Sequence, residues 1–544
     1  MTVLLSINDL SVAMPKGGDR ALALDGVSLT VSSGEIVCLV GESGSGKSMT
    51  AKAILGLLPP VARVAGGNIL LDGKGDLLRL PDADMRSVRG ARIGMIFQEP
   101  MTALNPLHSI GAQIAEAFEV HTGLSRREID VRVQALLAEV LIPDPRAAAK
   151  AYPHELSGGQ RQRAMIAMAL AMEPGVLIAD EPTTALDVTT QAQILKLIRA
   201  LQKRKGTGVL FITHDFGVVA EIADRVAVMQ GGKIVEHGAA EDILNRPQHP
   251  YTRRLIAAIP PLHPAPSRLR GEDTQLQVTE LSKTYGGKGL FRKSGRVISA
   301  LKNVSFDLHR GATLGIVGES GSGKSTLARC LVRLLYADSG RVRLDGVDLA
   351  GLSAKQWRRE SRRVQMVFQD PFGSLNPRRR VGDIVAQGPI VRGEPRKRVQ
   401  ARVQTLFELV GLAPDAVERF PHEFSGGQRQ RIGLARALAL EPEILIADEP
   451  VSALDVSVQA QVLELLVELR ERLGLSLVFI THDLRVAAKI ADDILVMQNG
   501  AVVEAGTAHQ VLLHPRHPYT QALVAAVPGR HWTPPAEGAA DSAA

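Results

Sequence analysis

The chain has little cysteine, few aromatic side chains and no long apolar run. Two of its 544 residues are cysteine, Cys38 and Cys330, and both lie in apolar segments. Two cysteines exclude a disulfide framework and a four-cysteine metal or iron–sulfur site, so we expect two buried thiols. One of the longest uncharged apolar stretches, 164–172, is far shorter than the roughly 18–20 residues that cross a bilayer. Any function at a membrane is therefore expected to depend on a partner protein.

Composition and charge indicate an ordinary globular protein. The chain is 45% hydrophobic and 22% charged, which excludes a wholly disordered or fibrous chain. The net charge is +7, and residues 355–403 hold 13 basic against 4 acidic side chains. Such a region can bind nucleic acid or anionic lipid. It is interrupted by the segment around Gln369, and scattered charge is usually solvated surface, so no nucleic-acid partner is expected.

The sequence consists of one module written twice. The segment 41–48 (GESGSGKS) returns at 318–325, and 157–163 (SGGQRQR) returns at 425–431. The offset between copies falls from 277 to 268 residues, so the intervening segments contain loops that absorb deletions. We predict a first domain over 1–260, a Pro-rich linker over 261–274, a second domain over 275–530 and a disordered tail over 531–544.

Within each copy, short apolar runs alternate with helical stretches, which predicts an α/β fold. The runs 35–41, 175–181 and 208–215 are typical of buried parallel strands with chemistry at their carboxyl ends. Asn499-Gly500 between two alternating segments indicates a type I′ hairpin, and Gly231-Gly232 can play the same part.

The glycine-rich segments match the phosphate-binding loop. Their glycines let backbone N–H groups converge on phosphate oxygens at a helix N-terminus, Lys47 and Lys324 would reach the β- and γ-phosphates, and Ser48 and Ser325 would ligate Mg²⁺. The predicted ATP-binding residues here are Gly41, Glu42, Ser43, Gly44, Ser45, Gly46, Lys47 and Ser48, and Gly318, Glu319, Ser320, Gly321, Ser322, Gly323, Lys324 and Ser325.

A second motif, ADEP, occurs at the end of a buried strand in each copy. Asp180 and Asp448 end these strands, where a carboxylate can hold the Mg²⁺ shell. Glu181 and Glu449 are suited to polarise an attacking water. The alternative is a helix-capping Asp-Glu pair with no chemical role.

Together these motifs resemble those of the ATP-binding cassette (ABC) ATPases. SGGQ follows Leu156 or Phe424, where Phe424 departs from the commoner leucine, and the other matching residues are Gln98, Gln369, His214 and His482. The resemblance implies two tandem P-loop nucleotide-binding domains, each with a RecA-like α/β core, an antiparallel β part and a helical signature subdomain. It also implies catalytic roles for the glutamates, glutamines and histidines, with Gln98 and Gln369 at the metal.

The signature segments are expected to begin helices. Serine is a natural N-cap, and an N-cap followed by two glycines exposes backbone donors to an anion. In ABC ATPases this site faces the γ-phosphate held by the opposite module, so the loop 41–48 would pair with 425–428, and 318–325 with 157–160. Both sites are predicted to hydrolyse ATP. The signature residues are Ser157, Gly158, Gly159, Gln160, Ser425, Gly426, Gly427 and Gln428.

The two copies differ where adenine is expected. Tyr285 is placed to stack on the base, whereas the corresponding residue of the first copy is Met14, which packs on a ring more weakly. Tyr285 could instead be a surface turn residue.

Two further repeated features resemble the oligopeptide/dipeptide/nickel branch of ABC importers: the LNP segments after Gln98 and Gln369, and the HPYT segments at 249–252 and 517–520. The resemblance implies an ATPase peripheral to the cytoplasmic face of the inner membrane, two permeases and an extracytoplasmic binding protein, with a di- or oligopeptide as the leading solute. Less favoured candidate solutes are glutathione-like thiols, peptide antibiotics, opines and nickel. The rival hypothesis is a soluble tandem ABC ATPase acting on the ribosome, and an exporter motor is the third.

Overall fold

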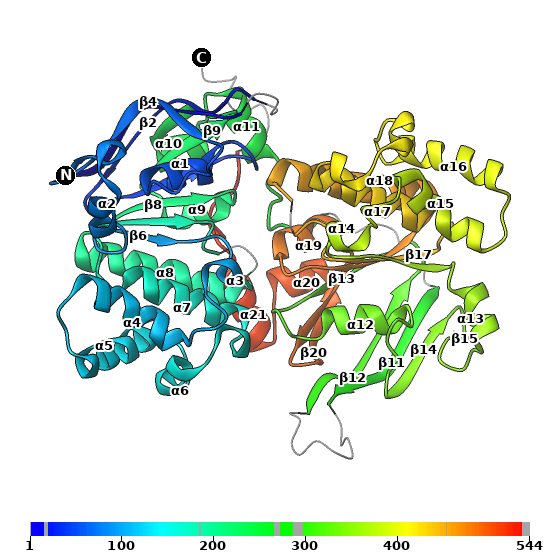
Figure 1. The fold of residues 1–544 in the computed structure, drawn as a ribbon. Coiled ribbons are helices and arrows are strands. Elements are labelled where there is room, and N and C mark those ends of the chain that lie inside the picture. Colours follow the sequence, from blue (N-terminus) through cyan, green and yellow to red (C-terminus); the bar gives the residue numbers. More distant parts are fainter. Residues whose placement is uncertain are drawn as a thin grey trace. The chain divides into compact units, whose positions relative to one another are not determined.

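The chain forms two units, each with one antiparallel and one mainly parallel sheet (Figure 1). The computed structural model describes residues 2–15, 20–183, 186–265, 273–286, 297–452 and 454–535. Unit 1 is Met1–Ile259 with Val527–Ala544, and unit 2 is Pro260–Ala526. Residues 266–272 of the expected linker and 536–544 of the expected tail lie outside the described residues.

Unit 1 has ten strands and eleven α-helices among its described residues, with 3₁₀ turns at Leu77–Arg79 and Pro153–Glu155. Its strands are β1 (Val3–Ala13), β2 (Leu22–Ser32), β3 (Ile36–Val40), β4 (Arg63–Leu71), β5 (Gly75–Asp76), β6 (Ile93–Ile96), β7 (Val176–Asp180), β8 (Gly208–Thr213), β9 (Arg225–Gln230) and β10 (Lys233–Ala239). Its helices are α1 (Lys47–Ile54), α2 (Asp82–Val88), α3 (Pro100–Ala103), α4 (Ile110–His121), α5 (Arg126–Glu139), α6 (Pro145–Lys150), α7 (Gly158–Leu170), α8 (Val188–Lys205), α9 (Phe216–Ile222), α10 (Ala240–Asn245) and α11 (Pro250–Ala257).

Unit 2 repeats this order, with 3₁₀ turns at Pro414–Glu418 and Pro421–Glu423. Its strands are β11 (Thr274–Tyr285), β12 (Ile298–His309), β13 (Thr313–Val317), β14 (Ser339–Leu344), β15 (Val347–Asp348), β16 (Val364–Val367), β17 (Ile444–Asp448), β18 (Ser476–Ile480), β19 (Asp493–Gln498) and β20 (Ala501–Thr507). Its helices are α12 (Lys324–Leu331), α13 (Ala354–Glu360), α14 (Pro371–Ser374), α15 (Val381–Val391), α16 (Arg396–Leu409), α17 (Gly426–Leu438), α18 (Val456–Leu473), α19 (Leu484–Ile490), α20 (Ala508–Leu513) and α21 (Pro518–Ala525).

The larger sheet of each unit brings the predicted strand ends together. In unit 1 its order is β10-β9-β3-β8-β7-β6, and all neighbours except β9 and β10 run parallel. Every residue of β3, β7 and β8 is buried, which suits a parallel strand covered on both faces. Because parallel strands end at one edge, the residues after β3, β7 and β8 meet there. The predicted buried parallel strands are confirmed.

The predicted hairpins are also confirmed. Asn499 and Gly500 both have positive φ (50° and 83°), and they connect β19 to β20 directly, with Gln498 opposite Ala501. Gly231 and Gly232 have φ values of 58° and 89° between β9 and β10. Positive φ at both central residues is the type I′ geometry, which matches the twist of the flanking strands.

A separate sheet and a helical part complete unit 1. The antiparallel sheet has the order β2-β1-β4-β5, and its Leu5 and Ile7 pack in one core with Leu39 of β3 and Ile54 of α1. Helices α4 and α5 pack on α7, which lies beside the edge strand β6 (Figure 1). The expected antiparallel and helical parts are therefore present, and the signature helix α7 joins the helical part to the sheet.

The last described residues of the chain pack in unit 1. The indole Nε1 of Trp532 donates to Asn245 Oδ1 at the end of α10 (3.2 Å). In unit 2, the Ala265 N–H donates to the Ala488 carbonyl of α19 (3.1 Å). No helix among the described residues is long and apolar enough to span a membrane.

Both cysteines are buried thiols, as predicted. Burial raises the pKa of Cys38 far above its usual value and that of Cys330 to about 11. Both side chains are therefore neutral and unreactive at neutral pH.

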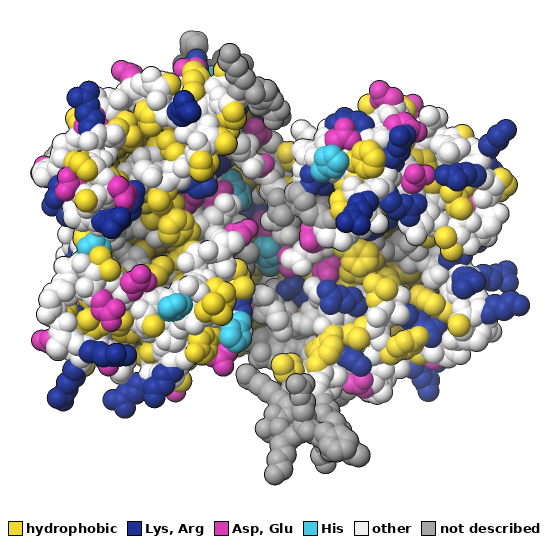
Figure 2. Space-filling model, viewed as in Figure 1, with side chains coloured by type: hydrophobic (Ala, Val, Ile, Leu, Met, Phe, Trp, Pro, Cys, Tyr) yellow, Lys and Arg dark blue, Asp and Glu magenta, His cyan; other side chains and the backbone are white. Residues whose placement is uncertain are grey.

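The basic region 355–403 lies within unit 2, and four of its thirteen basic side chains form ion pairs among the described residues. Its ion pairs include Arg363–Glu443, Arg380–Glu418, Arg396–Asp383 and Arg402–Glu394. Basic side chains on the visible face of this unit are interspersed with acidic and apolar ones (Figure 2). Part of the local charge is therefore balanced inside the unit.

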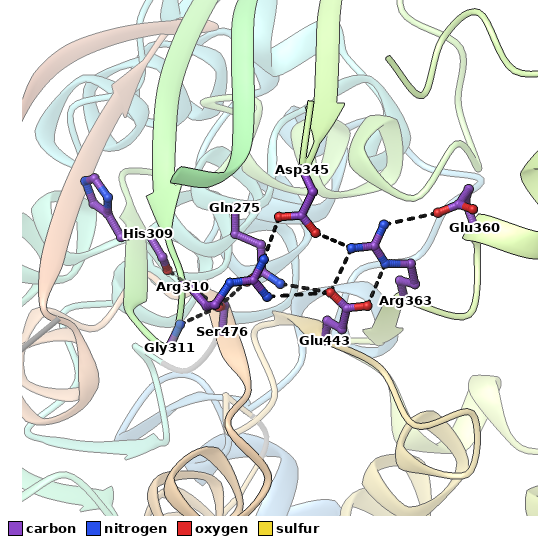
Figure 3. Close-up of polar contacts among 9 residues, drawn as sticks. All are labelled: Gln275, His309, Arg310, Gly311, Asp345, Glu360, Arg363, Glu443 and Ser476. Carbon is purple, nitrogen blue, oxygen red and sulfur yellow. Dashed lines mark hydrogen bonds and ion pairs between the residues drawn. The ribbon is translucent and has the colours of Figure 1, made fainter. Parts of the chain in front are cut away.

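One polar network is particular to unit 2 (Figure 3). Arg363, before β16, donates to both carboxylate oxygens of Glu443 (2.6 and 2.8 Å) and also pairs with Asp345 after β14. Arg310, after β12, donates to Asp345 (2.6 Å), and Gln275 of β11 donates to Glu443 (3.2 Å). The network ties the antiparallel sheet to the start of β17. In unit 1 the residue that precedes β7 is Gly175, which offers no carboxylate.

We predict that Glu443→Gln destabilises unit 2 by about 1 kcal/mol, a value limited by partial exposure and salt screening. The Arg363 hydrogen bond lowers the pKa of Glu443 below its usual 4.5, despite the opposing effect of burial. A lowered pKa stabilises the fold above the unfolded-state value, and this contribution is lost as pH falls through the folded-state pKa. Hydrogen exchange of β17 and β18 at pH 7 and below pH 4.5 measures the effect.

Glu464→Gln serves as the control, because Glu464 is exposed and makes a single ion pair, with Lys489 (3.4 Å). Equal protection of β17 in wild type and Glu443→Gln at pH 7 would contradict the prediction.

Candidate functional site

The phosphate-binding loop of each unit starts in a backbone conformation that requires glycine. Gly41 follows β3 with φ of 153°, and a Cβ there would lie 2.2 Å from the Met229 carbonyl oxygen of β9. Gly318 has φ of 150° and the same 2.2 Å clash with the Met497 carbonyl. Any side chain would push the loop off the neighbouring strand. The loop is thus fixed against the sheet from its first residue.

The lysine of each loop bonds to backbone carbonyls of the loop itself, and the serine bonds to the aspartate of the ADEP motif. Lys47 is buried, and its Nζ donates to the carbonyls of Gly41 and Glu42 (2.7 and 2.9 Å). Ser48 donates from Oγ to Asp180 Oδ1 at the end of β7 (3.0 Å). In unit 2, Lys324 donates to the carbonyls of Gly318 and Glu319 (2.7 and 2.8 Å) and Ser325 donates to Asp448 (3.1 Å).

The glutamate after each aspartate lies between the predicted glutamine and histidine. Gln98 Nε2 donates to Glu181 Oε2 (3.0 Å), and His214 Nδ1 lies 3.4 Å from Glu181 Oε1. In unit 2 the distances are 2.9 Å for Gln369–Glu449 and 3.3 Å for His482–Glu449. The structure therefore brings these six residues together as two matching triplets.

Both glutamates have left-handed backbone, which the sequence did not indicate. Glu181 and Glu449 have φ of 47°, a conformation that costs a non-glycine residue free energy. Their N–H groups donate to the carbonyls of Ile212 and Ile480 on the neighbouring strand (3.0 Å each). These bonds hold the strained residue in place, so each carboxylate is aimed away from the strand and towards the glutamine and histidine.

Burial and the contacts between them shift the pKa values of the histidine, glutamate and aspartate side chains. Burial alone would lower the pKa of His214, but the hydrogen bond to Glu181 and the charges of Glu181 and Asp215 raise it above its usual value. In unit 2, burial opposes the lowered pKa of Glu449, which results from His482. Burial raises the pKa of Asp180 and of Asp448, and the neighbouring glutamate adds to it. Each site therefore contains a histidine of raised pKa against the glutamate, beside an aspartate for which burial outweighs the lowering of its pKa by nearby cations.

The signature segments begin helices α7 and α17, as predicted. Ser157 Oγ accepts from the Gln160 N–H (3.3 Å), while Gln160 Oε1 accepts from the Ser157 N–H (3.0 Å). Ser425 and Gln428 form the same reciprocal pair with the same distances. This capping box engages two N–H groups and leaves the two glycine N–H groups of the first turn without a partner inside the helix. Gly158 is exposed at the start of α7, whereas Gly427 of α17 is buried.

Phe424, which replaces the commoner leucine directly before the second signature segment, is buried. The Arg419 guanidinium lies over its ring, 4.5 Å from the centroid, which is a cation–π contact. The larger side chain is thereby accommodated without changing the capping box that follows.

The two units differ where the base is expected. In unit 1 a cavity of about 380 Å³ adjoins the loop and is lined by Met14, Arg20, Ala23, Met49 and Lys52, together with loop residues, Gln98 and Glu181. In unit 2, Tyr285 is exposed, and its hydroxyl lies 3.5 Å from that of Thr326 in α12. Unit 1 thus offers thioethers and cations where unit 2 offers an aromatic ring.

Sequence reasoning did not identify Arg20, which donates to the Gly44 carbonyl of the loop. It also assigned no role to the HPYT tyrosines. Tyr251 and Tyr519 place their hydroxyls on the backbone of Glu42 and Glu319 (3.1 and 3.0 Å). The repeated HPYT segments were the available signal for the tyrosines, whereas nothing in the local sequence marks Arg20.

Two family descriptions match the chain. The ABC transporter family matches residues 24–184 and 301–452, and the family described as oligopeptide/dipeptide transporter, C-terminal region, matches 235–291 and 503–539. The chain is 51% identical over 527 residues to the peptidoglycan transport ATP-binding protein YejF of Agrobacterium fabrum, and the alignment covers 96% of each chain. It is also 46% identical over 556 residues to the glutathione import ATP-binding protein GsiA of Salmonella typhimurium, covering 96% of this chain and 89% of that protein.

These matches run through both copies and coincide with the two loop, aspartate–glutamate and signature sites described above. The chain therefore belongs to the ABC transporter family, as a tandem ATP-hydrolysing, ATP-binding protein of its peptide-importer branch.

Proposed function

We propose that this ATPase powers the uptake of peptides or peptide-containing solutes through two partner permeases. The observation that carries the proposal is the oligopeptide/dipeptide transporter region, which is present in both halves of the chain. The relatives named above transport peptidoglycan and glutathione, which share a short peptide as their common chemical part. An extracytoplasmic binding protein would deliver the solute, and the chain would lie at the cytoplasmic face of the inner membrane.

Magnesium fits the residues at the end of each loop. Ser48 and Asp180 of unit 1, like Ser325 and Asp448 of unit 2, present hard oxygen ligands that already lie within hydrogen-bond distance of one another. Mg²⁺ is typically held by one or two such protein oxygens plus nucleotide phosphates. A bound cation would also stabilise the charged form of the buried aspartates, whose pKa is raised. When bound, the ion would neutralise charge that develops on the phosphates.

The lysines, glutamates, glutamines and histidines of the two sites have separate proposed roles. Lys47 and Lys324 would bind the phosphates, and Glu181 and Glu449 would orient and polarise the attacking water. Gln98 and Gln369 would sense the metal and the water, since each contacts the glutamate directly. His214 and His482 would help to hold the same carboxylates in place.

Each complete site is proposed to be composite, with residues 1–260 and 275–530 as the two nucleotide-binding domains. The loop 41–48 would act with Ser425–Gln428, and the loop 318–325 with Ser157–Gln160. Support comes from the capped start of each signature helix, where the glycine N–H groups of the first turn have no partner inside the helix and can be offered to an anion. A single chain could then supply the whole ATPase pair.

The transport proposal is tested by affinity purification of the full chain from gently solubilised membranes. We expect two polytopic permeases to co-purify, and we expect ATP turnover of the complex to rise with a peptide-loaded binding protein. Recovery of ribosomal subunits without permeases would contradict the proposal and favour the ribosomal hypothesis.

Both sites are expected to hydrolyse ATP, because each keeps the same glutamate geometry. Glu181→Gln and Glu449→Gln should each lower turnover substantially, and the double variant should lower it about 100-fold or more, since the group that polarises water is lost. Phosphate release by the purified chain measures this. Glu116→Gln, an exposed change on α4, is the control. The claim of two competent sites is wrong if one substitution has no effect and the other abolishes turnover.

Nucleotide affinity is expected to depend on aromatic stacking in unit 2 alone. Tyr285→Ala should weaken adenine-nucleotide binding at one of two sites by about fivefold or more, because base–aromatic stacking contributes about 1–3 kcal/mol. Met14→Ala should weaken the other site by less. Titration of the full chain with a fluorescent ATP analogue measures both, with the exposed Tyr336→Ala as control. Equal losses from Tyr285→Ala and Met14→Ala would contradict this difference.

A further inference from the structure

The tyrosine of each HPYT segment reaches the phosphate-binding loop of its own unit. Tyr251 lies in the first turn of α11, and only 3% of it is exposed. Its hydroxyl accepts from the Glu42 N–H (3.1 Å) and donates to Glu42 Oε2 (3.2 Å). In unit 2, the Tyr519 hydroxyl accepts from the Glu319 N–H (3.0 Å). Two independent copies of the motif therefore make the same contact with the second residue of the loop.

The rest of the motif fixes the position of this tyrosine. Glu236 of β10 accepts from the N–H groups of Gln248 and His249 (2.6 and 3.2 Å). His249 then caps α11, its Nδ1 accepting from the Tyr251 N–H (3.2 Å). The carboxylate, imidazole and hydroxyl thus form one continuous chain from the sheet edge to the loop.

Unit 2 repeats this chain of contacts. Glu504 accepts from the N–H groups of Arg516 and His517 (2.8 and 3.1 Å), and His517 Nδ1 accepts from the Tyr519 N–H (3.2 Å). Burial opposes the lowered pKa of Glu504, to which its hydrogen bonds from these two N–H groups contribute. The agreement between units indicates that the contact follows from the motif and not from one local accident of packing.

The tyrosine and the loop lysine hold different backbone groups of the same residue. Lys47 holds the Glu42 carbonyl, while Tyr251 holds the Glu42 N–H, so the backbone on both sides of Glu42 is fixed. The tyrosine also holds the Glu42 carboxylate. A carboxylate free to move over the loop would repel the polyphosphate that the loop binds.

We propose that Tyr251 and Tyr519 are positioning residues of the two ATP sites, which hold the second residue of each phosphate-binding loop in its nucleotide-binding conformation. The HPYT segment is then a working part of the nucleotide site. The proposal rests on ATP binding by the chain and is independent of the solute that the transporter carries.

The test compares Tyr251→Phe, Tyr519→Phe and the double variant in the full chain. Phenylalanine keeps the packed ring and removes only the hydroxyl, so the unfolding midpoint of the nucleotide-free protein should change little. Each single variant should weaken one of two ATP sites about three- to tenfold, the range expected for one lost hydrogen bond, and the double variant should weaken both. The KM for ATP should rise by the same factor, while kcat changes less than twofold.

Tyr336→Phe is the matched control, because it removes the hydroxyl of an exposed tyrosine. Unchanged ATP affinity in the double variant overturns the proposal, as does a lowered unfolding midpoint with unchanged KM, since that shows a purely structural role. The assigned activity itself fails only if the wild-type chain binds no ATP, so the two failures are distinguishable.

Discussion

The phosphate-binding loop has to keep its backbone N–H groups directed inward, and the rest of each unit supplies the contacts that hold it there. Gly41 touches β9, Ser48 is joined to Asp180 at the end of β7, and Tyr251 of α11 holds Glu42. These contacts come from three elements distant in sequence. A loop pinned on three sides is organised before it meets a ligand, which lowers the entropic cost of binding. The sheet presents the β7 and β9 contacts, and helix α11 supplies the third.

The two units can be compared with each other, because they have the same order of elements and the same site motifs but differ in sequence elsewhere. The contacts around Glu181 and Glu449 agree to within 0.1 Å for both the glutamine and the histidine. Where the units differ, the difference lies outside this group: in the residues facing the base and in the network around Glu443 (Figure 3). The geometry around the glutamate is therefore the same in both units, whereas the residues facing the base and the ion-pair network differ between them.

Sequence reasoning succeeded where the signal was local. Buried strands, positive-φ hairpins such as Asn499-Gly500 and the N-caps Ser157 and Ser425 depend on a few adjacent residues, and the structure confirms them. It failed where the contact is remote. Tyr251 and Glu42 are 209 positions apart, and the left-handed backbone of Glu181 depends on a bond from a neighbouring strand. No periodicity or spacing encodes such contacts, because they arise only when the sheet has assembled.

The HPYT contact also changes how the family-defining tail is understood. A short series of bonds runs from Glu236 through His249 and Tyr251 to Glu42, and each member is fixed by the one before it. A displacement of α11 would therefore stretch or break the hydrogen bond between the Tyr251 hydroxyl and the Glu42 N–H of the loop. This series is a contiguous physical connection between the tail and the phosphate-binding loop. The segment that distinguishes this branch of transporters is thus joined directly to the chemistry that all ABC ATPases have in common.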